Sequence, residues 1–301
     1  MLRDMNEFDF VFLSYDEPNA EELYADLLNH VPWAKRVHGV KGFDAAHRAC
    51  ADVSDTEFFV TVDGDNRIDP AFLGFKIDIH DGQDDHAWTW AGRNHVNGLI
   101  YGNGGLKLWS KAFVRTMNSH ENSSDDGGKV DFCWSDRYHE RFGTYSTSMI
   151  NGSAYQAFRS GYREGVKMSL DEGRKVPGNE FKSRVWIYNL HKLLIWCSVG
   201  EDMEHGIWSI YGARLGVHDC NLTDQDHTMI RDYDWFNEKW ESVKNLDPLR
   251  GSHELGYRLR SALDIEVADL DPTQSRFFKK IYINPPRPLL NYEQIRHLMA
   301  N

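Results

Sequence analysis

The residues best suited to do chemistry are two carboxylates, Asp63 and Asp65, which are separated only by Gly64. They follow directly on the apolar run 58–62. Carboxylate oxygens are the hard ligands that Mg²⁺ and Mn²⁺ prefer, and these ions usually bind through one or two carboxylates plus substrate phosphates. A bare Asp-x-Asp can also be an acidic turn. Its position after a buried strand favours a metal site at Asp63 and Asp65.

The elements before this motif predict a nucleotide-binding α/β domain. The run 58–62 suits a strand buried on both faces, and 8–13 reads as an earlier strand followed by a helix over 20–30. Open α/β sheets bind ligands at the carboxyl ends of their strands. Three polar side chains follow the first strand, and they fit either ordinary loop chemistry or contact with a nucleotide: Ser14, Tyr15 and Glu17. Lys41, ahead of a helix expected at 43–51, would meet a phosphate or simply be solvated.

Composition limits the class of protein. The 301 residues carry a net charge of −12, which argues against a protein that coats nucleic acid non-specifically but leaves room for a local basic groove. The four cysteines are scattered, which fits a reducing cytoplasm. The start has no apolar signal core, and no run approaches the roughly 18 apolar residues that span a bilayer. We expect a soluble cytoplasmic protein with no membrane partner, and leave its oligomeric state open.

The stretch 97–109 is rich in glycine and lacks the spacing of a P-loop, so it is either a substrate-cradling loop or a structural turn. We expect a strand at 87–91 and an irregular connection at 66–75. Another short strand is expected at 130–134. Asp131 lies inside that apolar run, where an acid must be paired, desolvated or functional, and it is therefore a candidate catalytic base.

From about residue 153 the sequence is mainly helical. Segment 155–192 holds eight basic and four acidic side chains, inside a chain whose net charge is −12. This local reversal of sign indicates either a solvated face or a polyanion contact. We predict two regions, a nucleotide-sugar and metal-binding domain at 1–150 and a helical acceptor-binding region packed on it at 151–301.

An α/β half with Asp-Gly-Asp after a strand, a glycine-rich loop and a distant histidine resembles the GT-A class of nucleotide-sugar glycosyltransferases. The resemblance covers about residues 8–135. It implies a GT-A (Rossmann-like) mixed sheet flanked by helices, with a mainly helical C-terminal region. It also implies a divalent ion, Mn²⁺ or Mg²⁺, that holds a donor diphosphate. Asp63 and Asp65 match the motif, and His218, with His205 as second choice, would complete the coordination.

Segments 15–20, 34–42, 97–105 and 158–167 are also similar to phage-encoded glycosyltransferases. Some of that group decorate hydroxymethylated pyrimidines in phage DNA, including arabinosyltransferases that act on 5-hydroxymethylcytosine. The resemblance implies a UDP-sugar donor, held by Ser14, Tyr15, Glu17, Lys41 and Asp63. It also implies a set of residues that would bind double-stranded DNA as acceptor: Tyr101, Asn103, Lys107, Trp134, Arg159, Arg163 and Lys167.

The reaction implied is displacement of a nucleoside diphosphate from the anomeric carbon of a pentose or hexose. Inversion would need a carboxylate to deprotonate the acceptor hydroxyl, with Asp131 as first choice and Glu164 as second. The net charge suits a glycan, protein or small-molecule acceptor better than DNA. A non-enzymatic module that binds nucleotide or DNA is a third interpretation. The sugar and the stereochemical outcome stay open.

Overall fold

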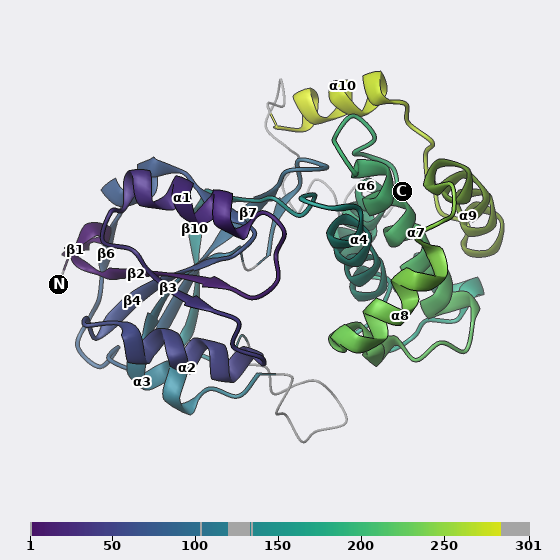
Figure 1. Cartoon of the computed structure of the whole chain (residues 1–301). Coiled ribbons are helices and arrows are strands. Elements are labelled where there is room, and N and C mark those ends of the chain that lie inside the picture. Colours follow the sequence, from purple (N-terminus) through teal and green to yellow (C-terminus); the bar gives the residue numbers. More distant parts are fainter. Residues whose placement is uncertain (1, 103, 120–132, 134, 284–301) are drawn as a thin grey trace.

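The structure is a computed structural model that describes residues 2–102, 104–119, 133 and 135–283. It is a mixed α/β fold in which a mixed sheet is flanked by helices and followed by a helical C-terminal region, which confirms the expected GT-A-like class (Figure 1). The sheet ends with β10 (Tyr138–Ser148), and α4 (Ala154–Met168) opens the helical region. The chain passes from one part to the other through residues 149–153.

The main sheet has eight strands in the order β3-β2-β4-β9-β7-β10-β5, with β8 paired to β7. Strands β3, β2, β4, β7 and β10 run in one direction, whereas β9, β5 and β8 oppose them. The carboxyl ends of β2, β4 and β10 therefore lie at the same edge, where the chain leaves for α4. The strands of this sheet are β2 (Asp9–Ser14), β3 (Lys35–His38), β4 (Phe58–Asp63), β5 (Asn66–Ile68), β7 (Ala87–Asn94), β8 (Ile100–Tyr101), β9 (Leu106–Ser110) and β10; β1 (Leu2–Asp4) and β6 (Lys76–Asp78) pair separately.

Helices cover both faces of the sheet, because strand side chains alternate between the faces. Phe10 and Phe12 pack with α1 (Ala20–His30) on one face, whereas Val11 packs on the other with α2 (Phe43–Val53) and α3 (Lys111–Thr116). Figure 1 shows α1 on one side of the sheet and α2 and α3 on the other. The buried strand at 58–62 and the helix at 20–30 are confirmed as β4 and α1.

Six strands were not expected, namely β1, β5, β6, β8, β9 and β10. The segment predicted as an irregular connection contains β5 and the 3-10 turn Pro70–Gly74, and β10 was not predicted at all. β10 pairs with β7 through two register shifts, and Phe142 on it is 98% exposed. A bulged strand that is half solvated has no regular alternation of apolar residues, so its pattern is not visible in the sequence. The strand expected at 130–134 lies outside the described residues apart from Cys133.

The glycine-rich stretch has a structural role. A Cβ on Gly104 would lie 2.6 Å from the backbone nitrogen of Gly92, and a Cβ on Gly105 would overlap the amide of Asn66. These glycines let β9 enter the sheet between β4 and β7. Of the two interpretations left open, the structural turn is the one that these contacts support.

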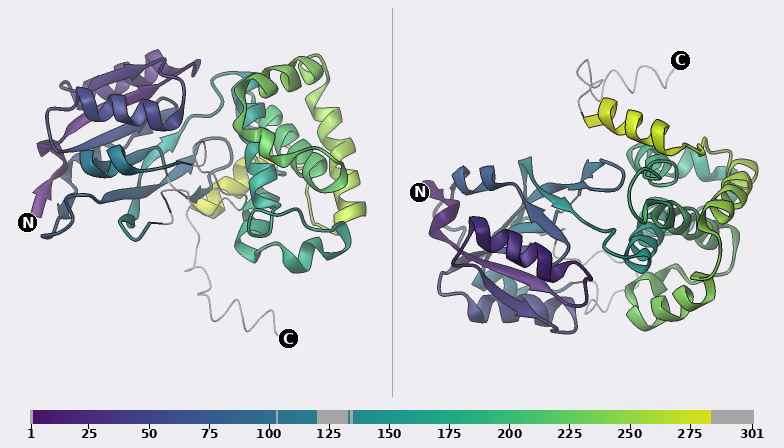
Figure 2. Two further views of the ribbon diagram at one scale, coloured as in Figure 1. Left: turned by 90° about the horizontal axis from the view of Figure 1, so that it is seen from below. Right: turned by 45° about the horizontal axis from the view of Figure 1, so that its top comes forward.

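The helices of residues 154–283 gather on one side of the sheet region, with α9 on the far side in all three views (Figures 1 and 2). Within the described residues, none of the helices is long and apolar enough to cross a membrane. After α4 come the 3-10 turn Gly178–Glu180, α5 (Phe181–Arg184), α6 (Ile187–Trp196), α7 (Gly206–Leu222), the 3-10 turn His227–Arg231, α8 (Tyr233–Val243), α9 (Pro248–Leu263) and α10 (Pro272–Ile283).

Helices α4 and α7 cross backbone to backbone. Each helix carries two glycines four residues apart, and each glycine faces a backbone carbonyl of the other helix. A side chain at any of these positions would overlap that carbonyl. Small residues at this spacing let helix axes approach closely. The four contacts are Gly161 with Ser209, Gly165 with Ala213, Gly212 with Phe158, and Gly216 with Tyr162.

We expect Gly161→Ala to destabilise the protein, by about 1–3 kcal/mol, because its methyl group would enter the carbonyl of Ser209. In an exposed helix the same change is stabilising, by about 1 kcal/mol, so the sign itself is informative. Urea denaturation followed by tryptophan fluorescence measures the effect. Ser160→Ala, at the next position of α4, is the control, and an equal response of the two variants would contradict the close crossing.

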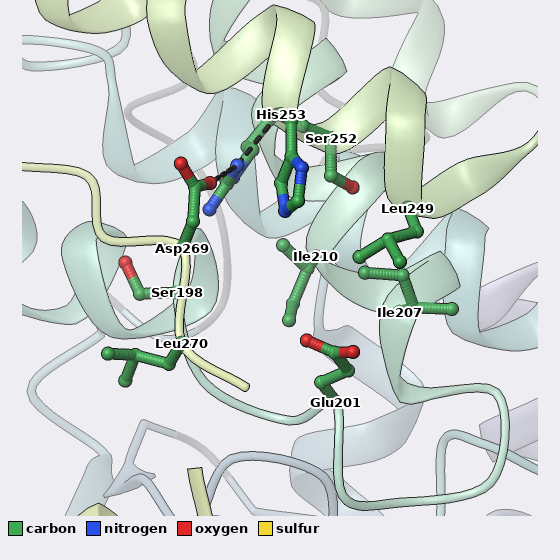
Figure 3. A pocket seen from close by; sticks show the side chains of 10 residues that line it. Ser198, Glu201, Ile207, Ile210, Leu249, Ser252, His253, Asp269 and Leu270 are labelled. Carbon is green, nitrogen blue, oxygen red and sulfur yellow. Dashed lines mark hydrogen bonds and ion pairs between the residues drawn. The ribbon is translucent and has the colours of Figure 1, made fainter. Parts of the chain in front are cut away.

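Arg214 is the polar centre of the helical region. It is 1% exposed and donates to the carbonyls of Cys197, Ser252 and Ala268, and it pairs with Asp269. Figure 3 shows Ser252 and Asp269 on the wall of a small pocket between α7, α9 and the segment after α9. One buried cation therefore ties α7 to three other segments. Buried charges are retained in proteins when they are paired and hydrogen-bonded in this way.

Candidate active site

Three carboxylates meet at the carboxyl edge of the sheet. β2 and β4 are parallel neighbours, so the loop after β2 brings Glu17 to the turn that follows β4 and carries Asp63 and Asp65. The backbone N–H of Tyr15 donates to Oε2 of Glu17 at 2.7 Å, and a Cβ on Gly64 would lie 2.6 Å from the same oxygen. Gly64 is therefore needed for the close approach of Glu17.

The three carboxylates repel one another. Burial raises the pKa of Asp65 to about 6, and the nearby charges of Asp63 and Glu17 add to this rise. The side-chain amide of Asn66 donates to Asp65 at 2.6 Å and opposes it. Burial likewise raises the pKa of Glu17. A cation at this edge would relieve the repulsion.

One buried cation already lies beside Asp63. Lys107 is 5% exposed, and its Nζ donates to the carbonyl of Gly104 at 2.7 Å and lies 3.5 Å from Oδ2 of Asp63. The backbone N–H of Asp63 also donates to the carbonyl of Gly105. Lys107 was predicted to bind the acceptor, but the structure places its amine among the carboxylates.

Asp63 and Asp65 fit a hard divalent ion by the chemistry of their oxygens and by the repulsion that Lys107 and Asn66 offset only in part. Among the described residues, however, no group of three His, Cys, Asp or Glu side chains is arranged to hold a metal. The protein would thus supply two carboxylates, Asp63 and Asp65, and phosphates or water would supply the remaining ligands.

His218 is not brought to these carboxylates. It lies on α7, where its Nδ1 is 3.2 Å from Asp219. Asp219 also accepts from the hydroxyl of Tyr162 and pairs with Lys239 at 2.6 Å. His205 precedes α7 in a left-handed conformation, 3.8 Å from Glu204. In the described structure, neither histidine has a contact that completes a site with Asp63 and Asp65.

Helix α4 directs two guanidinium groups towards the sheet edge. Arg159 stacks on the ring of Tyr233, 3.8 Å from the centroid, and that ring contacts Tyr15 at 5.7 Å. Burial lowers the pKa of Arg163 and the charge of Arg159 lowers it further, while the charges of Glu164 and, to a smaller extent, Asp65 oppose this shift. Residues of α4, α8 and both strand ends thus meet at one place.

Glu164 belongs to a separate cluster. It accepts from the hydroxyl of Tyr101 at 2.7 Å and pairs with Lys167 at 3.0 Å, while the indole N–H of Trp196 donates to the same hydroxyl. Burial alone would raise the pKa of Glu164, but Lys167 and the Tyr101 hydrogen bond outweigh it and leave the pKa lowered. Because a carboxylate with a lowered pKa is a weaker base, this position is less suited to the catalytic role proposed for it.

The remaining predicted site residues are either placed by a few contacts or lie outside the described part of the chain. Ser14 is buried and accepts from Nε of Arg36 at 3.1 Å, and Lys41 is exposed ahead of α2. Lys167 is exposed at the end of α4. Three predicted residues lie outside the described part of the chain, namely Asp131, Asn103 and Trp134, so their roles stay predictions.

Tyr233 was missed by the sequence analysis. Asp232 caps α8 by accepting from the N–H groups of Asp234 and Trp235, which fixes Tyr233 at the first position of the helix. The capping aspartate predicts where the helix starts. No local signal tells that its first residue meets Tyr15 and Arg159, because that contact joins segments far apart in the chain.

His47 lies behind the carboxylates and is the most strongly perturbed histidine described. Its Nδ1–H donates to the carbonyl of Phe43 at 2.9 Å, its ring stacks on Phe43, and Nε2 has no hydrogen-bond partner among the described residues. Burial lowers its pKa to about 4. Protonation of the folded protein at His47 is therefore unfavourable.

We expect acid to destabilise the protein through His47. The unfolded chain takes up this proton near pH 6.5 and the folded chain only near pH 4, so stability is lost as the pH falls between these values, by up to about 3 kcal/mol. Urea denaturation of wild type and His47→Gln from pH 7 to pH 4 measures this. The variant should lose part of the acid sensitivity, and the exposed His80→Gln should not. Parallel pH curves for wild type and His47→Gln would refute the assignment.

No family model and no curated protein matches this sequence. Among solved structures, the chain is similar to a glycosyltransferase involved in the glycosylation of the major capsid of PBCV-1. The identity is 15%, the match covers 49% of this chain and 97% of the other, and the TM-score is 0.31. A likeness at this level does not establish an activity.

Proposed function

We propose that this protein is a metal-dependent glycosyltransferase that uses a UDP-sugar as donor. The observation that carries this proposal is the convergence of Glu17, Asp63 and Asp65 at the carboxyl edge of an α/β sheet. This is where such sheets bind nucleotides. Three crowded carboxylates in that position favour a ligand that brings a cation. A nucleoside diphosphate is such a ligand, because it binds together with a divalent ion.

Each residue of the edge has a distinct task in this proposal. Asp63 and Asp65 would hold Mg²⁺ or Mn²⁺, which when bound neutralises charge on the departing diphosphate. Lys107 keeps Asp63 in place through their ion pair. Glu17, tied to the N–H of Tyr15, shapes the loop on which the nucleoside would lie. Ser14 and Lys41 stay candidates for contacts to the nucleotide.

For the acceptor we propose the hydroxymethyl group of 5-hydroxymethylcytosine in double-stranded phage DNA, with arabinose or another pentose, or a hexose, transferred. This finer assignment rests on the resemblance of segments 15–20, 34–42, 97–105 and 158–167 to phage DNA glycosyltransferases. Lys167 on α4 and Tyr101, which donates to Glu164 of the same helix, are the described candidates for contact with the acceptor. A modified base reached from a duplex would be flipped out of the stack.

A different acceptor is favoured by one observation. Several cations of segment 155–192 are engaged by the protein itself, which leaves fewer for a DNA backbone. Under this alternative the same chemistry serves a glycan, a protein or a small molecule. The engaged cations and their partners are Lys167 with Glu164, Lys175 with the carbonyls of Thr223 and Gln225, Lys182 with Asp264, and Arg184 with Asp171.

Mass spectrometry of nucleosides tests both the transfer of sugar from a UDP-sugar and the identity of the acceptor. DNA containing 5-hydroxymethylcytosine is incubated with the full chain, Mn²⁺ or Mg²⁺ and a panel of UDP-sugars, with an EDTA control. A metal-dependent gain of one pentose or hexose mass is the expected result. UDP release without modified DNA would support the alternative acceptor, and no turnover of any UDP-sugar would refute glycosyl transfer from UDP donors.

A further inference from the structure

Arg159 and Arg163 are one turn apart on α4 and lack a partner for their charge. Neither guanidinium makes a hydrogen bond or an ion pair with any of the described residues, and Nε of each is buried. Their charges are close enough that Arg159 lowers the pKa of Arg163. Two neighbouring cations without an anion are unfavourable in a protein unless a ligand supplies the missing charge.

Neighbouring cations on the same segment behave differently, since several pair with the protein's own acids or carbonyls. What sets Arg159 and Arg163 apart within the described part of this segment is that their unpartnered Nε atoms are buried, whereas Arg174 is exposed to solvent. The contact with Tyr233 also supports ligand binding by Arg159. The Tyr233 ring holds the guanidinium of Arg159 by stacking on its face, which leaves the N–H groups at the edge of that guanidinium available to a ligand.

Arg159 lies near the carboxylate edge, because the Tyr233 ring on which it stacks contacts Tyr15, and Arg163 follows one turn later on the same helix. Asp65 contributes to the electrostatics of Arg163, yet no ion pair joins these two described residues. A simple anion that approached the arginines would be repelled by Glu17, Asp63 and Asp65. A diphosphate that carries a divalent cation satisfies both sides at once, because its oxygens reach the guanidinium groups while its cation reaches the carboxylates.

We propose that Arg159 and Arg163 bind the diphosphate of the donor nucleotide, and not the backbone of a DNA acceptor. This assignment rests on the proposed function. In the reaction, the bond between the anomeric carbon and the β-phosphate oxygen breaks, and its electron pair stays on the diphosphate. A new bond forms between the anomeric carbon and the acceptor oxygen, whose proton passes to a carboxylate or water. The guanidinium groups donate to the departing diphosphate and stabilise its growing charge.

The test compares nucleotide ligands that differ only in phosphate. Isothermal titration calorimetry measures UDP and uridine binding to the full chain with Mg²⁺ for wild type, Arg159→Gln, Arg163→Gln and Arg163→Lys. We expect each glutamine variant to bind UDP about 10- to 100-fold more weakly with uridine unchanged, as for loss of a charge-assisted hydrogen bond. The lysine variant should recover part of the loss. Arg174→Gln removes the same charge from an exposed position and should match wild type.

Inorganic pyrophosphate gives a second readout. It should compete with UDP on wild type and lose this competition in Arg163→Gln, while circular dichroism confirms that the variant is folded. Equal weakening of UDP and uridine would overturn the assignment, as would unchanged UDP affinity with a raised KM for DNA. Wild-type protein that binds no UDP would overturn the proposed function together with it, so the two failures are distinguishable.

Discussion

Asp65→Asn and Asp63→Asn are each expected to reduce sugar transfer by about 100-fold or more, because each removes a metal ligand and with it the charge that offsets the departing diphosphate. Asparagine keeps the size of the side chain, so the loss would report charge and not packing. In both variants, raising the concentration of Mn²⁺ should restore part of the activity, since weaker metal binding is the cause. Release of UDP from the donor measures the effect.

Asp84→Asn is the matched control. Asp84 is exposed and precedes β7, at the opposite edge of the sheet from the carboxyl ends of β2 and β4. The variant Asp84→Asn changes the net charge by the same amount as Asp63→Asn or Asp65→Asn, and it should leave sugar transfer unchanged. Full activity in both Asp63→Asn and Asp65→Asn would exclude the metal-site interpretation of the motif.

Arg214→Met is expected to cause the largest loss of stability in the helical region. Methionine fills a similar length but removes the donor to three carbonyls and leaves Asp269 with Arg260 as its remaining partner. Removing one partner of a buried ion pair costs about 3–5 kcal/mol. The midpoint of urea denaturation, followed by tryptophan fluorescence, should therefore fall well below that of wild type.

Arg250→Met serves as the comparison for Arg214. Arg250 pairs with Glu254 on the surface of α9, where both side chains are more than half exposed. Exposed pairs of this kind contribute about 0.5 kcal/mol or less. If the two variants unfold at the same urea concentration, Arg214 does not hold the helical region together.

Local pattern was sufficient for the first half of the fold. β2, α1, α2 and β4 follow apolar periodicity closely, and Asp63 and Asp65 are placed by the strand that precedes them. β5 and β10 were not predictable in this way, because β5 has three residues and β10 is bulged and partly solvated. Their pairing depends on partners elsewhere in the chain, which a single window of sequence does not contain.

Only the part of the site that lies at the carboxyl ends of the strands was predictable from the sequence. Arg159 and Arg163 belong to the basic segment 155–192, and their assignment to an acceptor came from the resemblance to phage-encoded glycosyltransferases. The structure adds the long-range contacts that change this picture, namely Tyr233 with Arg159 and Asp65 near Arg163. His218 illustrates the same limit, because a position downstream of the motif does not determine which face of α7 meets which neighbour.

The close crossing of α4 and α7 determines which segments should change their amide hydrogen exchange when a ligand binds. Arg163 lies midway between Gly161 and Gly165, so its backbone is held by direct contact with α7 before any ligand arrives. The backbone amides of these two helices should be among the last in the protein to exchange with deuterium. A ligand that bridges the arginines and the carboxylates would then protect the loops at 14–19 and 63–66 and the start of α8, while exchange in α4 stays as slow as it already was.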